Sequence, residues 1–154
     1  MSNVLSVTML LQYALENFAL FSGGLFSGAA IYISLTEHPP RTLLSFSSIL
    51  ALYRTNAARI RAVLTTLAAV TALAAIVAAM LGSGIGWLVG GAIHAAAVVF
   101  LLTNGARISE ELDGLGTGPG SEAAGKKLLQ RQAMHYSLLS LAGLVAQGLF
   151  ILKP

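Results

Sequence analysis

The sequence predicts an all-α integral membrane protein, an up-down four-helix bundle with both termini on the non-cytoplasmic side. Three observations support this fold. The 154 residues are 56% hydrophobic and only 10% charged, with a mean hydropathy of +0.79, whereas a soluble domain carries about 25% charged residues. Four stretches of the chain lack charged side chains over a length that can cross a bilayer. The basic residues gather on one side of these stretches.

The uncharged stretches place the spans, because crossing a bilayer takes about 20 apolar residues. Residues 62–106 contain no Asp, Glu, Lys or Arg, and a Gly-rich turn at residues 82–86 divides them into two helices. Residues 17–36 and 132–152 are also uncharged. The predicted spans of this single membrane domain are about 10–36, 60–81, 87–106 and 130–152. They are helices rather than barrel strands, since no alternation of period two is present.

The first stretch has a competing interpretation as a signal peptide. Its start, Met-Ser-Asn-Val-Leu, has no basic segment, and the apolar run is longer than a signal peptide requires. We therefore expect a permanent helix. Pro39 and Pro40 should end it, because the residue before a proline is pushed out of the helical region.

Lys and Arg predict the orientation. Eight of the nine basic residues lie in or beside the first and third connections, and only Lys153 lies at the other face. The eight are Arg41, Arg54, Arg59, Arg61, Arg107, Lys126, Lys127 and Arg131. The positive-inside rule then places both polar connections in the cytoplasm. We attribute the basic charge to membrane orientation and expect no nucleic-acid partner.

The two polar connections differ in character. Residues 42–53 mix large apolar side chains with serines, which predicts an interfacial helix or an extension of the second span. Residues 113–125 are rich in glycine and predict a mobile loop, least ordered at residues 114–120. Gly24 and Gly28 lie four residues apart, a spacing that lets helices approach closely in lipid, either within one chain or between copies in a homo-oligomer.

Ionisable and amide side chains gather at the cytoplasmic ends of the predicted spans, and such groups at membrane depth are expensive and often functional. The candidate catalytic residues are Glu37, His38, Arg54, Asn104, Arg107 and His135. The alternative is that polar helix ends only anchor and orient the chain. We favour that interpretation for Arg59, Arg61, Lys126 and Lys127, with their neighbours Glu110 and Glu111.

His94 lies in the middle of the third span, about 15 Å deeper than Asn104 at helical rise. A buried neutral imidazole needs a hydrogen-bond partner, which favours a structural bond to another helix. A haem ligand or a pocket-lining group is the alternative. We expect no cofactor, although two histidines and a carboxylate could bind an iron or copper ion. At the opposite end, Glu16 is expected to be solvated.

The segment Glu37-His38-Pro39 with Arg41, after the Gly-rich run of residues 19–35, resembles the anthrone oxygenase-like family of small four-helix membrane proteins. Most bacterial members of that family are uncharacterised. Looser matches to its motifs are Tyr53-Arg54, Thr103-Asn104, and Arg131 with His135. Two positions depart from the family pattern, because Gln132 stands where a Trp is expected and Leu138 where an Arg is expected.

The resemblance implies the oxygenation of an activated aromatic CH₂ group to a quinone carbonyl without a bound cofactor. That reaction needs a base of near-neutral pKa and a cation for the enolate oxygen. His38 or His135 would be the base, with Glu37 orienting His38. The oxyanion partner would be Arg54, Asn104 or Arg107. An apolar cavity between the helices would hold the planar substrate.

We therefore expect a membrane oxidoreductase of the bacterial inner membrane that acts on a small hydrophobic aromatic or quinone-like compound, with lipid around it. The alternatives are a non-enzymatic membrane protein, such as an assembly factor, a lipid-binding module or a complex subunit, and a haem-binding or metal-binding bundle. Each histidine should face the bundle interior or its cytoplasmic mouth. His38 and His135 should share one polar pocket, with Glu37 or Asn104 hydrogen-bonded to one of them.

Overall fold

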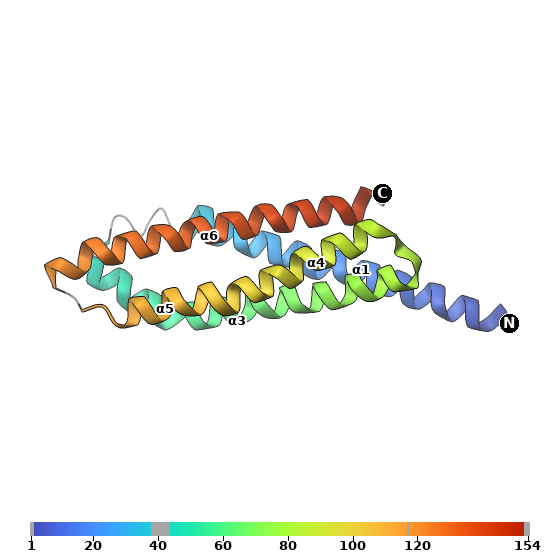
Figure 1. The fold of residues 1–154 in the computed structure, drawn as a ribbon, viewed down its shortest axis with the longest axis horizontal. Helices are drawn as coiled ribbons and strands as arrows, with labels where there is room; N and C mark the ends of the chain where they lie inside the picture. The colour runs from blue at the N-terminus through green and yellow to red at the C-terminus, as the bar shows by residue number, and fades with distance from the viewer. Residues whose placement is uncertain (1, 38–43, 117, 153–154) are drawn as a thin grey trace.

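The computed structural model describes residues 2–37, 44–116 and 118–152, and these residues form helices and short connections without a strand (Figure 1). In chain order the elements are α1 (Ser2–Tyr32), η1 (Ile33–Glu37), α3 (Phe46–Ala78), η2 (Ala79–Ser83), α4 (Ile85–Phe100), η3 (Leu101–Gly105), α5 (Ala106–Asp113) and α6 (Pro119–Leu152). η1 and η3 are single π-helical turns, whereas η2 is interrupted at Gly82, whose backbone is not helical. Four helical stretches are long and apolar enough to cross a membrane, which confirms the predicted helical class.

The four long helices lie side by side, and each packs against two others. α1 contacts α3 and α6, and α4 contacts the same two helices (Figure 1). The two chain ends lie at the end of the bundle where η2 joins α3 to α4, and the first part of α1 extends past the other helices. We call this end the turn end. The opposite end, with α5 and the beginnings of α3 and α6, is the loop end.

Each of the four long helices begins before its predicted span. α3 begins at Phe46, where the side chain of Ser45 accepts a hydrogen bond of 3.3 Å from the Ser48 amide and so caps the helix. The segment at residues 42–53 is therefore mostly an extension of the second span, one of its two predicted forms. The third span continues through η3 and α5 to Asp113. The uncharged stretches therefore lie within longer helices and do not mark where those helices begin.

The Gly-rich connection is shorter than the predicted loop of residues 113–125, because α6 begins at Pro119. Proline suits a first helical position, and Glu122 pairs with Lys126 at 2.7 Å one turn later. Gly125 is buried against Phe46, and a Cβ there would overlap the phenyl ring. This glycine therefore permits a close helix contact rather than flexibility. Thr117 lies outside the described residues, so low order at residues 114–120 stays a prediction.

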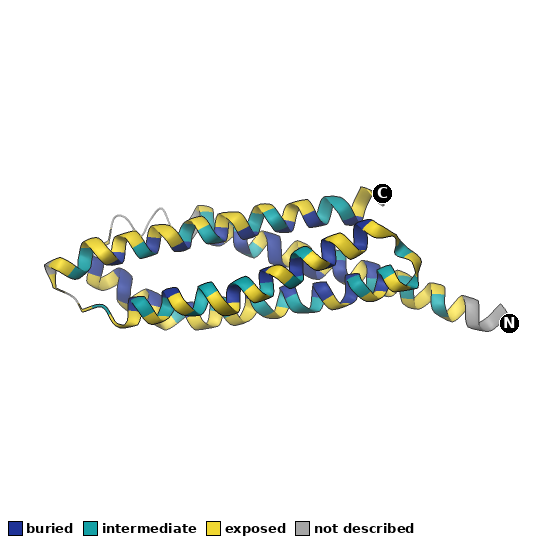
Figure 2. Cartoon of the chain, viewed as in Figure 1, coloured by how far each residue is buried: buried dark blue, intermediate teal, exposed yellow. Residues whose placement is uncertain are grey.

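The turn between α3 and α4 lies where the glycines predicted it. Gly82 has φ +107° and Gly84 has φ +99°, in the region that L side chains rarely adopt. The reversal lets α4 return along α3. Buried residues line the interior along the length of the bundle (Figure 2). They form three apolar clusters, with Tyr53 and Leu112 in the one at the loop end, Phe26 and Tyr136 in the middle one, and Trp87 in the one at the turn end.

Candidate functional site

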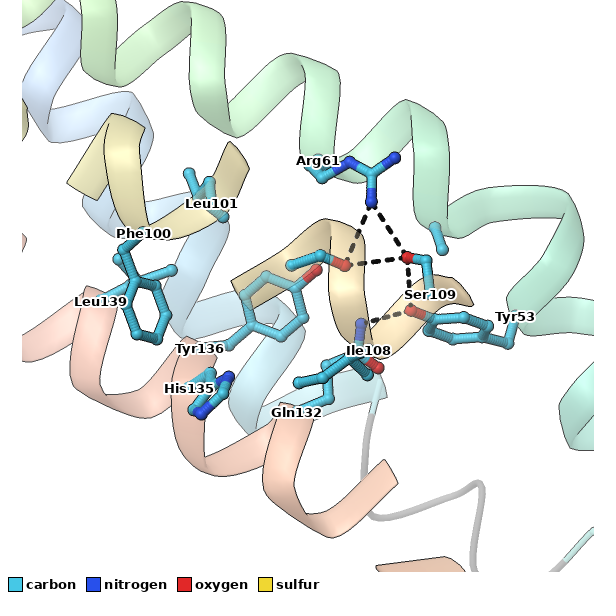
Figure 3. Close-up of a pocket in the computed structure, with 12 residues that line it drawn as sticks. Tyr53, Arg61, Phe100, Leu101, Ile108, Ser109, Gln132, His135, Tyr136 and Leu139 are labelled. Atoms are coloured by element: carbon cyan, nitrogen blue, oxygen red, sulfur yellow. Dashed lines mark hydrogen bonds between the residues drawn. The ribbon is translucent and has the colours of Figure 1, made fainter. Parts of the chain in front are cut away.

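A network of hydrogen-bonded polar side chains crosses the interior at the loop end and joins three helices (Figure 3). We call it the polar network. Arg61 of α3 donates from Nη1 to the Gly105 carbonyl at 3.1 Å and to Ser109 Oγ at 3.0 Å. Ser109 of α5 lies 3.1 Å from the Tyr53 hydroxyl. Gln132 of α6 donates from Nε2 to the same Tyr53 hydroxyl at 3.0 Å. The polar network therefore connects α3, α5 and α6 through side chains that are distant in sequence.

The π-helical turn η3 supplies the carbonyl at the centre of the polar network. Gly105 ends η3, and its carbonyl accepts from Arg61 and, at 3.0 Å, from Ser109 Oγ. Single π-helical turns inside α-helices frequently occur at functional sites, because they re-aim the backbone and its side chains. Here the turn lies between α4 and α5, so it brings Gly105 and Ser109 to the face that meets Arg61.

These side chains line a small cavity that also reaches His135. Its volume is about 20 Å³, and its wall includes Tyr53, Arg61, Gln132 and His135. A space of this size holds one water-sized group. The Gln132 Oε1 atom is buried and has no hydrogen-bond partner among the described residues. The cavity therefore offers a cation, a base and an unused acceptor to one small polar group.

His135 lies at the outer side of this cavity, between α6 and α4. Its imidazole is half-buried and makes an edge-to-face contact with Phe100, with ring centroids 4.9 Å apart. It thus lines an interior cavity, as predicted for the histidines. A half-buried imidazole next to an aromatic ring can meet both the cavity and a compound that arrives from outside the bundle.

The other predicted site residues of the described chain lie away from this cavity. Arg54 donates to the carbonyls of Asp113 and Leu115 at 3.0 and 3.1 Å, so it holds the end of α5. Arg107 is exposed and pairs with Glu111 at 2.9 Å. Asn104 donates to its neighbour Thr103 at 3.4 Å. Their catalytic roles stay predictions, and none of them lines the cavity of His135.

Arg61 lines the cavity of His135, whereas the predicted cations Arg54 and Arg107 do not. The sequence favours a membrane anchor at Arg61, yet its guanidinium points into the bundle. The signal that could have found it is spacing, since Tyr53, Ala57 and Arg61 recur every four residues on one helical face. On α6, Gln132, His135 and Tyr136 likewise share a face.

His38, Arg41 and the side chain of Glu37 lie outside the described residues. The shared pocket of His38 and His135 therefore stays a prediction. The side chain of Asn104 forms its hydrogen bond with Thr103 rather than with His135. Of the three histidines, His135 and His94 both face the interior, as expected.

No family model matches the chain, and comparisons with curated proteins and with solved structures found no match either. The likeness to anthrone oxygenase-like proteins thus stays an expectation drawn from short motifs. What the chain does must be inferred from its own side chains.

His94 is fully buried at the centre of the bundle. Its Nδ1 atom lies 3.0 Å from the Gly90 carbonyl of the same helix, so the predicted bond to another helix is wrong. Because a carbonyl only accepts, Nδ1 carries the proton, and Nε2 is an acceptor to which no described residue donates. The rings of Phe26 and Phe150 flank the imidazole at centroid distances of 5.4 and 6.0 Å.

These contacts of His94 do not fit a haem ligand. A porphyrin on Nε2 would require this part of the core to open, because Nε2 is buried and the adjacent Phe150 is itself stacked on Trp87 at 4.6 Å. Within the described ranges, no three His, Asp or Glu side chains are placed to hold a metal ion. The arrangement is instead that of a packed core histidine.

Glu16 differs from its prediction at the turn end. It is 8% exposed rather than solvated, because η2 and α1 pack together there. Gln12 donates to the Glu16 carboxylate at 3.3 Å and to the Ser83 hydroxyl at 3.1 Å. A polar contact therefore ties α1 to the turn between α3 and α4.

Proposed function

We propose that the chain is an integral membrane protein of the bacterial inner membrane, with the loop end in the cytoplasm and both termini outside. Two observations support this. Large apolar side chains lie exposed on all four long helices, among them Phe21, Leu73, Val99 and Leu141, and a soluble surface rarely carries so much apolar area. The basic side chains of the described residues gather at the loop end, as the positive-inside rule requires of a cytoplasmic face.

Within that membrane, the proposed function is oxidation of a small hydrophobic aromatic or quinone-like compound. The observation that carries the proposal is that His135 and Arg61 both line the same small cavity. An imidazole can take a proton at neutral pH, and a guanidinium can hold the oxygen on which negative charge develops. Both groups come from opposite sides of the same small space (Figure 3).

In the proposed reaction His135 removes a proton from an activated CH₂ group, and Arg61 holds the resulting enolate oxygen. The carbanion transfers an electron to O₂, and the two radicals combine into a C–O bond. The peroxide takes up the proton from His135, and loss of water leaves the carbonyl. One O₂ therefore converts CH₂ into C=O and releases one water molecule, and the four-electron oxidation of the carbon is balanced by the four-electron reduction of O₂.

The cavity of about 20 Å³ limits how the compound binds. It admits the enolate oxygen but not a ring system, since sites for whole drug-sized ligands are about 300–1,000 Å³. The rings would therefore lie on the outer side of His135, against Phe100, which offers an aromatic face. This position is reached from the lipid without passage through the packed core.

Oxygen uptake by the detergent-purified protein tests the proposal, with anthrones and hydroquinones as substrates. His135→Ala and Arg61→Gln should each lower the turnover rate at least about 100-fold, which is the usual contribution of a general base or an oxyanion donor. Lys127→Gln changes an exposed cation at the same end and is the control. Full activity of folded His135→Ala would contradict the mechanism.

Absence of turnover by the unaltered protein would instead favour a non-enzymatic membrane protein. A visible absorption spectrum and a metal analysis of the same preparation separate the third alternative. A Soret band or stoichiometric metal would favour a haem-binding or metal-binding bundle.

A further inference from the structure

A groove runs along the outside of the bundle between α1 and α3, beside the middle apolar cluster. Its volume is about 560 Å³, which lies within the range of ligand sites. Its walls are almost entirely apolar and include Leu25, Tyr32 and Val63. It is separate from the cavity of His135, with which it shares no lining residue.

The floor of the groove is formed by two glycines. Gly24 and Gly28 are exposed, and a Cβ on either would meet no atom within 4 Å. Close packing within the chain, one explanation of their spacing, is therefore wrong for this pair. By contrast, a Cβ on the neighbouring Gly23 would overlap Gln147. Gly24 and Gly28 instead leave room on the outer face.

Arg59 closes the groove at its loop end. Its side chain is exposed and makes no hydrogen bond or ion pair with any residue that the structure describes. Arg54 and Arg107, by contrast, pair with Asp113 and Glu111. Arg61, two residues further along α3, points into the bundle. The groove thus combines an apolar trough with a cation, Arg59, that no described side chain compensates.

We propose that this groove binds an acyl chain of an anionic phospholipid of the cytoplasmic leaflet, with the lipid phosphate on Arg59. The inference rests on the proposed membrane insertion and not on the oxidation reaction. From Tyr32 to Gly24 the trough descends about 12 Å along α1 at helical rise, away from the loop end and into the apolar part of the bundle. A guanidinium matches a phosphate with two parallel hydrogen bonds, and the cytoplasmic leaflet carries anionic lipid.

Charge decides between a lipid and a second copy of the chain. Two copies in one membrane have the same orientation, and a two-fold contact through Gly24 and Gly28 uses the same surface on both. Such a contact would bring both Arg59 side chains to one level beside the seam, where like charges repel. An anionic headgroup compensates the same charge, so the lipid is the favoured occupant.

Native mass spectrometry of the full chain tests the proposal. The protein is extracted from membranes in a mild detergent and supplied with equimolar phosphatidylglycerol and phosphatidylethanolamine. The unaltered chain should retain one phosphatidylglycerol in preference to the zwitterionic lipid. Arg59→Gln should lower that preference about tenfold, the loss expected for a hydrogen bond to a charged group, and Arg59→Lys should restore part of it.

The groove itself is tested by filling it. Gly28→Leu should reduce the retention of both lipids, whereas Gly148→Leu, at another open glycine on α6, should not. Arg131→Gln, at an exposed arginine outside the groove, is the control for charge. Each variant must show helical circular dichroism and one elution peak.

Three results would overturn the proposal. These are no preference for phosphatidylglycerol in the unaltered chain, full preference in Arg59→Gln, or a dimer that Gly28→Leu dissociates. Lipid retention needs no turnover, so oxygen uptake measured on the same preparation separates failure of this site from failure of the proposed reaction.

Discussion

Arg61 and Ser109 are joined by a hydrogen bond of 3.0 Å from the guanidinium Nη1 to the hydroxyl oxygen, and this bond ties α3 to α5 beside the cavity of His135. Both acceptors of Arg61, the Ser109 hydroxyl and the Gly105 carbonyl, are neutral. No carboxylate of the described chain lies within ion-pair distance of this guanidinium. Its charge is therefore held in place without being compensated, as an oxyanion site requires.

Arg61→Lys tests whether the shape of the cation matters as well as its charge. Lysine keeps the charge as a flexible point charge, but it lacks the planar fork that bonds Gly105 and Ser109. We expect oxygen uptake with an anthrone to fall about tenfold, less than for Arg61→Gln. Measured turnover equal to that of the unaltered protein would show that the fork has no part in the reaction.

Tyr53→Phe tests whether the polar network contributes to the free energy of unfolding. The substitution removes the hydroxyl that accepts from Gln132 and contacts Ser109. Gln132 would then lack partners at both ends of its buried amide, since Oε1 has none already. Leaving such a group unpaired costs about 1–3 kcal/mol. Thermal unfolding in detergent, followed by circular dichroism, should show the loss.

Tyr13→Phe provides the matched control, because Tyr13 is 65% exposed on α1. Its removal should leave the midpoint of unfolding unchanged. Equal effects of the two substitutions would mean that the polar network does not stabilise the fold.

Gly90→Ala tests the tight packing of α4 against α6. A Cβ at Gly90 would overlap the ring of Phe150, which is fully buried and stacked on Trp87. Because this ring has no free space to enter, overpacking should cost about 1–3 kcal/mol. Gly148→Ala, where a Cβ meets nothing within 4 Å, should be neutral or gain up to about 1 kcal/mol from helix propensity. Stabilisation by Gly90→Ala would contradict the packing.

The sequence predicted the helical class well, because apolar length and missing charges are local properties. It misplaced the ends, since α6 begins at Pro119 rather than near residue 130. Charge-free stretches report which residues avoid water, whereas a helix continues into water wherever caps and ion pairs support it. The pair of Glu122 and Lys126 gives such support on the first turns of α6.

The site was less predictable, because its contacts depend on how the helices are set against one another. The bond from Gln132 to Tyr53 joins residues 79 positions apart. No local pattern gives that register. His135 was recognised by residue type alone, whereas Arg61 was one of several arginines and only its inward face distinguished it. The burial of Glu16 was missed for the same reason, since it depends on how α1 packs in the bundle.

The orientation in the membrane is open to a direct chemical test, because the sequence contains no cysteine. Ser83→Cys places a thiol in the turn between α3 and α4, and Lys127→Cys places one on an exposed position at the loop end. A maleimide that cannot cross membranes reacts with thiols that reach water. In intact spheroplasts we expect labelling of the Ser83→Cys protein only, since the basic loop end should face the cytoplasm. After the membrane is opened, the Lys127→Cys protein should label as well. Labelling of Lys127→Cys but not of Ser83→Cys before the membrane is opened would show the opposite orientation. Arg59 and Arg61 would then lie at the outer surface, and Arg59 could not pair with a lipid of the cytoplasmic leaflet.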